Sequence, residues 1–404
     1  MNRSLLTLLI GRILTNFADS FYMIATIWYV KTVTHSPFLI GLTSAVAILP
    51  VTLQFLYGPL IDRYSKRKIL TIAMTGQAVI VSIIALLYFS DLLWLPLLFL
   101  LMFFALSLSE STYPTESALI QQITPREKLT KVNSIFSFSY QTLDLLCDAI
   151  SGVLIVFVGL GVIYLANSFI LFAIAILFLL YLQEPKSPKK ASESTVGFWR
   201  QYKEDFIQGL SVVKERKKLL QLLFGIIGIN VMATMSLAML PVISSSSAEF
   251  GFWLTSMSIG VLVGTVLSSK VERFPLNRVF PLASFFSGAF WILSIVNIEH
   301  LILRLTFFGL AWVGVGVLSI FVQTLIQVNL PEEHIGSGFS FLSSLLGSLS
   351  PLGYLLGGLL AEWTSSTLIL LLAAIGYLGF SLYYILNSKL NKLVHPLGVS
   401  FEKT

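Results

Sequence analysis

Charged side chains inside long apolar segments are the residues of this chain whose types and positions could do chemistry. Asp19, Glu110, Asp144 and Asp148 are acids in such segments, and Arg12 is an embedded base. A charge at the centre of a membrane helix is unfavourable by roughly 2.5–3.5 kcal/mol on insertion scales. Groups retained at that cost are functional candidates, and carboxylates among them commonly take up and release protons. We therefore expect these residues to couple proton movement to another process.

Spacing indicates which of these groups share a helix face. Asp144 and Asp148 are four residues apart, so they lie about one turn apart and can exchange a proton, although Asp148 could instead serve helix packing. Arg12 and Asp19 share a face but lie about 10 Å apart along the axis, so we do not expect an ion pair. Glu116 lies nearer the cytoplasmic end, where it is either a partner of the basic cluster at 63–68 or a member of the acidic group.

Membrane helices are the elements that must position these residues. The 404 residues are 56% hydrophobic and only 11% charged, against about 25% charged in soluble proteins. A bilayer core needs roughly 20 apolar residues per helix, which predicts an all-α membrane protein with twelve transmembrane helices. We expect them at 5–30, 38–61, 69–90, 92–119, 130–158, 161–183, 219–243, 248–269, 278–297, 301–328, 335–361 and 366–387.

Basic residues predict the topology, because cytoplasmic loops are enriched in Lys and Arg. With both termini cytoplasmic, all of the 26 Lys and Arg residues except Arg12, Lys31 and Arg304 lie on the cytoplasmic side. The net charge of +6 therefore reflects topology and gives no reason to expect nucleic acid as a partner. A single cysteine, Cys147, and four scattered histidines leave no disulfide framework, metal site or cofactor to expect. Short connections leave no room for a soluble catalytic domain.

The longest connection divides the chain into two six-helix bundles. We predict an N-terminal bundle at 1–184, a cytoplasmic linker at 185–218, a C-terminal bundle at 219–388 and a cytoplasmic tail at 389–404. Within the linker, 198–218 is amphipathic and is either an interfacial helix or a solvated tether.

Three matches in the same order indicate that the two bundles are copies. Leu-Ile-Gln-x-x-x-Pro-x-Glu occurs at 119–127 and 325–333, Gly11 and Asn16 match Gly225 and Asn230, and 62–63 matches 272–273. The architecture is therefore a parallel repeat, which typically holds substrate near the membrane centre and works by alternating access.

The duplication also provides an internal comparison for the embedded charges. At the equivalent positions of the second bundle, Arg12 becomes Ile226 and Asp19 becomes Ala233. The scaffold therefore does not need these charges, which favours a functional role for them.

The segment 58–68, Gly-Pro-Leu-Ile-Asp-Arg-Tyr-Ser-Lys-Arg-Lys, resembles the G-x-x-x-D-R-x-G-R-K signature of the major facilitator superfamily, with Ser65 where the family usually has Gly. The resemblance implies the major facilitator fold and a gating loop that latches the cytoplasmic side; the alternative is a topology anchor alone. The gating residues that it implies are Gly58, Asp62, Arg63, Lys66, Arg67 and Lys68, with Glu116 beside them. It also places Asp19 and Glu110 on the cavity wall, because the first and fourth helices line the cavity in that family.

Pro114 and the segment 125–133 are similar to the macrolide-efflux-type drug exporters and, more weakly, to lysophospholipid transporters. Two features depart from the exporter pattern. An arginine common in the fourth helix is missing, with Ala105 in that region, and Asp144 and Asp148 stand where many antiporters have a glycine-rich motif.

Aromatic and polar residues in the spans predict a large pocket for an amphipathic, cationic or lipophilic ligand. Its expected members are Tyr22, Tyr113, Tyr140, Asn230, Gln323 and Gln327. The sequence thus favours a proton-coupled exporter (an antiporter) of drug-like molecules. Transport of lysophospholipid or another lipid-like metabolite without strict proton coupling, metabolite import and a transport-derived sensor remain open. We expect no enzyme activity, and we expect a monomer in a bacterial plasma membrane whose partners are substrate, protons and lipids.

Overall fold

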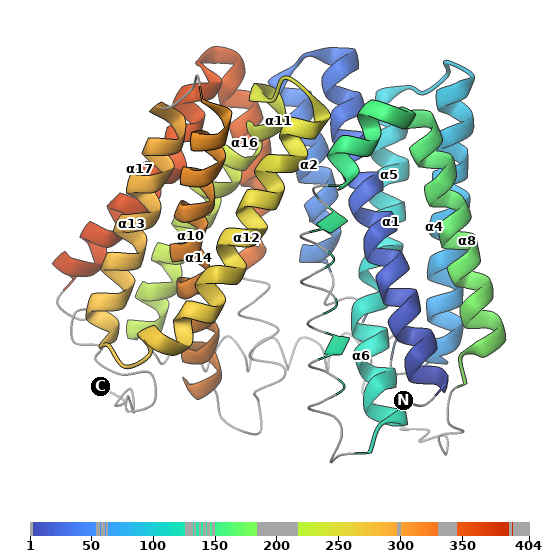
Figure 1. Ribbon diagram of the computed structural model, residues 1–404, viewed down its shortest axis with the longest axis horizontal. Helices are drawn as coiled ribbons and strands as arrows, with labels where there is room; N and C mark the ends of the chain where they lie inside the picture. The colour runs from blue at the N-terminus through green and yellow to red at the C-terminus, as the bar shows by residue number, and fades with distance from the viewer. Residues whose placement is uncertain are drawn as a thin grey trace. The chain divides into compact units, whose positions relative to one another are not determined.

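The computed structural model is helical in all the secondary structure that it describes (Figure 1). The described residues are 3–53, 57, 61, 64–125, 132, 135–136, 139, 143, 146–147, 150–183, 217–296, 300–329, 346–387 and 390. The predicted helix at 198–218 lies outside them except at its last two residues, as does the predicted tail except at residue 390.

The chain divides into two compact units that do not follow the chain order throughout. One comprises Met1–His35, Val46–Glu193 and Ser244–Thr255, and the other comprises Ser36–Ala45, Ser194–Ile243 and Ser256–Thr404. The division passes through two helices, α2 (Pro37–Thr52) and α12 (Ser247–Val271), because the first residues of each belong to a different unit from the rest.

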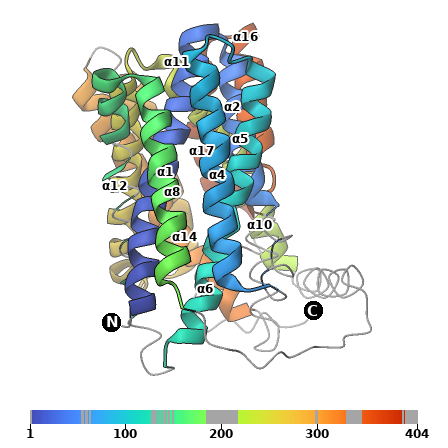
Figure 2. The same cartoon turned by 90° about the vertical axis from the view of Figure 1, so that its right-hand side faces the viewer.

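The first unit is built around α1 and α4. Its described helices are α1 (Arg3–Thr34), α4 (Lys66–Phe89), α5 (Leu95–Glu110), α6 (Thr112–Ile123) and α8 (Leu160–Tyr181). Helix α8 packs against both α1 and α4, and α4 also contacts α5 and α6 (Figure 2). This arrangement lets side chains from α1, α4, α5 and α6 meet inside one unit.

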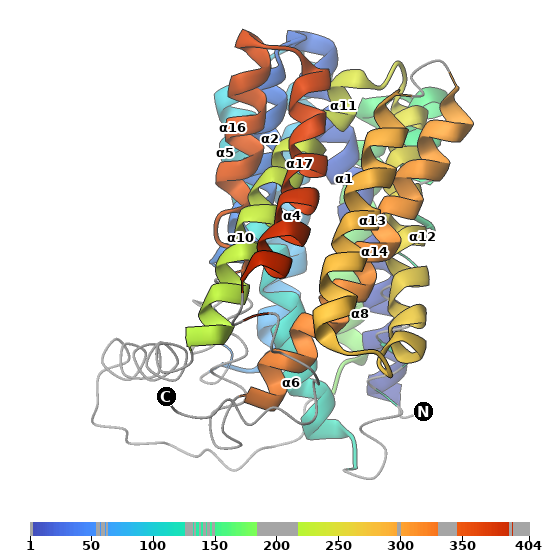
Figure 3. The same ribbon diagram turned by 90° about the vertical axis from the view of Figure 1, so that its left-hand side faces the viewer.

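The second unit has α13 and α17 as its most extensively packed helices. Its described helices are α10 (Lys217–Leu237), α11 (Leu240–Ile243), α13 (Leu276–Val296), α14 (Leu301–Asn329), α16 (Ser350–Trp363) and α17 (Ser366–Leu386). Helix α13 packs against α14 and α17, while α10 packs against α16 and α17 (Figure 3).

Eight helices in the described part of the chain are long and apolar enough to cross a membrane. They are Lys66–Phe89, Leu95–Ile120, Leu160–Tyr181, Gln221–Ile243, Ser247–Val271, Leu276–Val296, Leu301–Leu325 and Ser366–Leu386. Each overlaps one of the segments expected from the sequence. Their exposed surfaces are apolar, as lipid-facing surfaces are, with Leu, Phe and Ile side chains exposed along most of them.

Proline interrupts two of the predicted continuous spans. The span expected at 92–119 becomes α5 and α6, which separate at Ser111, and the span at 219–243 becomes α10 and α11. A proline lacks an amide hydrogen, and its ring clashes with the carbonyl four residues earlier. Pro114 and Pro241 therefore break the helical ladder, and short-range bonds from the Ser111 amide to Leu108 and from the Met239 amide to Ser236 replace it.

The packing of the first helix of each half preserves the internal repeat. Gly11 of α1 lies against the ring of Phe178 in α8, and Gly225 of α10 lies against the ring of Phe380 in α17. A Cβ at either glycine would approach the facing ring closer than 3 Å. The two pairs are thus the same contact made twice, between the first and last helix of each predicted six-helix half.

Glycines also allow α12 and α14 to approach backbone to backbone. Gly260 lies against Gly309, and Gly264 lies against Val313 and Gly316. Small residues at such contacts are typical of membrane helix interfaces, where close van der Waals packing drives association.

We predict that Gly264→Ala destabilises the protein, because the added methyl group would overlap the backbone carbonyl of Val313. Overpacking of this kind typically costs about 1–3 kcal/mol. The matched control is Gly228→Ala in α10, where a Cβ would meet open space and alanine is the better helix former. Thermal unfolding of the purified variants should show a lower midpoint for Gly264→Ala and an unchanged or higher one for Gly228→Ala. Equal midpoints would contradict the close packing.

Candidate functional site

A buried ion pair between α1 and α6 lies within the first unit. Nη2 of Arg12 is 2.7 Å from Oε2 of Glu116, and Nε of Arg12 donates to the same oxygen at 2.8 Å. The two side chains are only 7% and 3% exposed. Charge-assisted bonds of this kind are stronger than neutral ones. Each charge needs the other, because either one alone would be buried without compensation.

The helix break at Ser111 positions the carboxylate of this pair. After this break α6 begins at Thr112, and its first two turns contain Tyr113 and Glu116, which both contact Arg12. The ring centre of Tyr113 is 5.1 Å from the guanidinium carbon of Arg12, within the range of a cation–π interaction. Arg12 is therefore held by a carboxylate and by an aromatic ring from a single short helix.

Asp19 forms a second polar centre on α1, one that joins three helices. Nε2 of Gln77 in α4 donates to Oδ1 of Asp19 at 2.5 Å, and the hydroxyl of Ser109 in α5 donates to Oδ2 at 2.5 Å. An ionised carboxylate only accepts hydrogen bonds, so both donors suit the charged form. Glu110, the last residue of α5, is half-buried and follows Ser109 directly.

The same region contains buried polar atoms that no described group satisfies. They are Nδ2 of Asn16, the hydroxyl of Tyr22 and Oε1 of Gln77. Asn16, Asp19 and Tyr22 are spaced by three residues, so they follow one face of α1 together with Arg12. Buried polar groups normally find a partner or an ordered water. Unused hydrogen-bonding capacity thus lies on the same face of α1 as the Asp19 carboxylate.

The remaining predicted residues of the first unit fall into two groups. Tyr22 is fully buried, with its ring edge-on to Tyr164, and Tyr113 is 55% exposed and contacts Arg12. Asp144, Asp148 and Tyr140 lie outside the described residues.

The gating segment is described only in part. Gly58, Asp62 and Arg63 lie outside the described residues, whereas Lys66, Arg67 and Lys68 form the first turn of α4. Ser65, which departs from the family signature, accepts a hydrogen bond from the Lys68 amide and caps the helix. Arg67 donates to the Leu179 carbonyl in the last turn of α8, where a cation is favourable. Glu116, which the sequence associated with this cluster, is paired with Arg12 instead.

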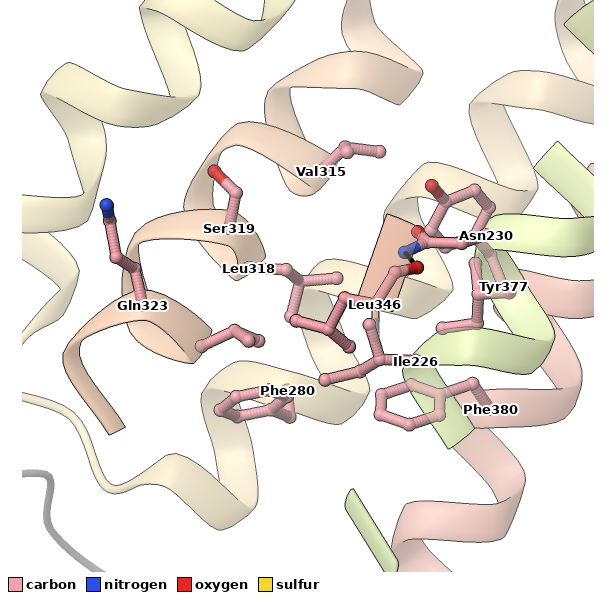
Figure 4. A pocket seen from close by; sticks show the side chains of 12 residues that line it. Ile226, Asn230, Phe280, Val315, Leu318, Ser319, Gln323, Leu346, Tyr377 and Phe380 are labelled. Carbon is pink, nitrogen blue, oxygen red and sulfur yellow. Dashed lines mark hydrogen bonds between the residues drawn. The ribbon is translucent and has the colours of Figure 1, made fainter. Parts of the chain in front are cut away.

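A cavity of about 350 Å³ lies within the second unit (Figure 4). It brings together Asn230 and Gln323, both expected from the sequence to line a substrate pocket. Gln327 lies in α14, but its side chain is outside the described set. The remaining lining residues are Ile226, Ile229, Phe280, Val315, Leu318, Ser319, Val322, Leu346, Tyr377 and Phe380.

Sequence reasoning missed the hydrogen-bond partners of Asp19 and most of the cavity wall. Gln77 carried a usable signal, since an amide in the middle of an apolar helix invites a search for a partner. Ser109 and Ile226 carried none, because serines and isoleucines are common throughout these helices. Among the described residues no cluster of His, Cys, Asp and Glu could hold a metal ion.

Described apolar helices of membrane-crossing length and an internal repeat define a multi-pass membrane protein, and its family and relatives make it a transporter rather than an enzyme. The chain belongs to the Major Facilitator Superfamily, whose profile matches residues 8–353. It is thus a multi-pass protein of the bacterial cell membrane.

Relatives and solved structures agree with this assignment at low identity. The chain is 22% identical to an uncharacterized MFS-type transporter, YfiS, of Bacillus subtilis (strain 168), over 96% of this chain and 94% of that one. It is also 22% identical to the staphyloferrin A transporter of Staphylococcus aureus (strain NCTC 8325 / PS 47), over 83% and 84%. A POT family transporter crystallised with a thioalcohol-conjugated peptide has a TM-score of 0.73 at 12% identity, covering 96% and 97%.

We predict that Glu116→Val destabilises the protein by about 3–5 kcal/mol, because it leaves the Arg12 guanidinium buried without its carboxylate. The double variant Arg12→Ile/Glu116→Val removes both charges together and should recover most of that loss. Urea or thermal unfolding of both variants in one detergent measures the difference. If the double variant loses as much unfolding free energy as the two single variants lose together, the two side chains do not stabilise each other.

Proposed function

We propose that this transporter is a proton-coupled exporter of amphipathic, cationic or lipophilic small molecules that works by alternating access. The observation that carries the proposal is the concentration of ionisable groups within the helices of the first unit. Asp19, Glu110 and the Arg12–Glu116 pair all lie there, while the repeat-equivalent Ile226 and Ala233 are uncharged. Charges that the scaffold does without in its second copy are suited to a coupling role.

The hydrogen bonds of Asp19 supply a way to convert protonation into movement. A protonated carboxyl must donate one hydrogen bond, whereas Gln77 and Ser109 now both donate to Asp19. The new hydroxyl therefore needs an acceptor. The Ser109 hydroxyl can accept by rotating its own hydrogen away, and Gln77 can accept by turning its amide, which would bring its unsatisfied Oε1 to the carboxyl. Protonation of Asp19 would thus rearrange the hydrogen bonds that join α1 to α4 and α5.

Substrate chemistry and direction follow from the residue types and from the resemblance to known exporters. Carboxylates and tyrosine rings attract cations, and the resemblance of 114–133 to macrolide-efflux-type exporters favours outward transport of drug-like molecules. The 22% identity to a staphyloferrin A transporter favours a molecule of the staphyloferrin A kind as an alternative cargo. The twelve-helix topology with both termini cytoplasmic belongs to the same proposal and follows from the distribution of Lys and Arg.

A transporter of lysophospholipid or a similar lipid-like metabolite, without strict proton coupling, is the second candidate. The observation in its favour is the cavity of the second unit, whose lining is mostly apolar. The two candidates differ in their need for a proton gradient.

We predict that Asp19→Asn abolishes proton-coupled export, because an amide keeps the size of the carboxylate but cannot take up a proton. The measurement is efflux of a fluorescent lipophilic cation from everted vesicles, with and without a protonophore. Wild-type efflux should stop on addition of the protonophore. Asp91→Asn, which makes the same change at an exposed carboxylate between α4 and α5, is the matched control and should transport normally.

Two outcomes would contradict the proposal. Efflux by the wild type that survives the protonophore would exclude proton coupling and favour the lipid-like candidate. Coupled efflux by Asp19→Asn would remove Asp19 from the mechanism while leaving the transporter class unchanged.

A further inference from the structure

The cavity of the second unit occupies the position that corresponds to the Arg12 ion pair of the first unit. Gly11 and Asn16 match Gly225 and Asn230, which fixes the correspondence between α1 and α10. The contacts of the two glycines with Phe178 and Phe380 show that the correspondence holds in three dimensions. The repeated motif that begins at residue 119 in α6 and at residue 325 in α14 establishes which residues of these two helices correspond.

This correspondence relates each member of the ion-pair site to a residue that lines the cavity. Arg12 corresponds to Ile226, Tyr113 corresponds to Ser319, and Glu116 corresponds to Val322. All three counterparts are among the lining residues. A guanidinium, a phenol and a carboxylate are thus replaced by three smaller uncharged side chains. The space that the ion pair fills in one unit is therefore open in the other.

The lining has an apolar interior and a polar edge. Phe280, Tyr377 and Phe380 are buried in the wall, whereas Ser319 and Gln323 are exposed. In Figure 4, Ser319 and Gln323 lie across the cavity from Tyr377 and Phe380. Asn230 donates one amide hydrogen to the Leu346 carbonyl at 3.2 Å and has a second one to offer. No charged side chain is present among the described residues that line the cavity.

The volume and the absence of charge define what would bind. An engineered apolar cavity of about 150 Å³ holds benzene, so about 350 Å³ accommodates a larger ring system or a branched chain. A charged group would lose its hydration there without gaining a counter-ion. A neutral group that carries one hydrogen-bond acceptor would find the Asn230 amide, and apolar surface on most other sides.

We propose that this cavity is a binding site for the neutral, apolar end of an amphipathic ligand, an aromatic or branched group that carries one carbonyl or hydroxyl. The inference rests on the proposed function in one respect, that the ligand belongs to the transported class. It adds a division of labour between the repeats, with ionisable chemistry in the first copy and neutral recognition in the second. The site lies wholly within the second unit, among α10, α13, α14 and α17 and the segment that carries Leu346.

Photolabelling with benzophenone tests the site directly, since this probe is a neutral two-ring ketone that inserts into nearby C–H bonds on illumination. The full-length protein in lipid nanodiscs would be labelled, digested and mapped by mass spectrometry. We expect adducts in the peptides that carry residues 226–230 and 315–323. 4-Benzoylbenzoate and the corresponding benzyl trimethylammonium cation have the same rings with a charge added, and both should label these peptides far less.

Two variants that fill the cavity should remove the labelling. Val315→Phe places a ring in the space, and Ile226→Arg/Val322→Glu rebuilds the ion pair of the first unit. Each should reduce labelling of 226–230 and 315–323 by roughly tenfold, because the ligand and the new side chain compete for one volume. Val266→Phe, which makes the same change on the exposed surface of α12, is the matched control and should label as the wild type does.

Labelling that is unchanged by Val315→Phe, or equal for neutral and charged probes, would overturn the proposal. Labelling spread over all exposed apolar helices would overturn it as well. Binding is measured here without a proton gradient, so Asp19→Asn should label normally even where it does not transport. Loss of coupling with retained labelling would refute the proposed function alone, and coupled transport without labelling would refute the site alone.

Discussion

A charge in an apolar helical bundle is tolerated only where a partner lies within contact distance, and this constraint organises the first unit. Arg12 depends on Glu116 for compensation, and Glu116 depends equally on Arg12. Their contact fixes the rotation of α1 relative to α6, and the short helix that carries Glu116 also places the Tyr113 ring at the guanidinium. With α1 oriented in this way, Asp19 lies within hydrogen-bond distance of Gln77 and Ser109 on two further helices.

Helix breaks and glycine contacts provide the geometry that this polar centre requires. The Pro114 interruption ends α5 just after Ser109 and Glu110 and starts α6 just before Tyr113 and Glu116. Residues that serve Asp19 and residues that serve Arg12 are thus separated into two short helices, although they are close in the chain. Gly11 meanwhile lets α1 approach α8 at the Phe178 ring, one residue before Arg12.

The two copies of the fold retain their packing and differ in their polar chemistry. Gly225 and Phe380 repeat the contact of Gly11 and Phe178, so the helix geometry was preserved after duplication. The polar pair was not preserved, and its counterpart positions line an uncharged cavity. Packing contacts are shared requirements of both copies, because each copy must bury its own helices. A buried charge has no such structural justification, which is why its presence in a single copy supports the coupling role proposed for it.

The sequence by itself determined the class of molecule, the approximate extents of most described helices, the internal repeat and the location of Arg12, Asp19, Glu110 and Glu116 within helices. Those properties follow from composition, segment length and local motifs, which are readable along the chain. Tertiary structure alone decided that Arg12 pairs with Glu116, 104 residues away, and that Asp19 is held by Gln77 and Ser109. It alone decided that Ile226, Ser319 and Val322 border one cavity. These contacts depend on the rotation and depth of each helix, and a helix that is apolar on nearly every face carries little periodic signal to specify either.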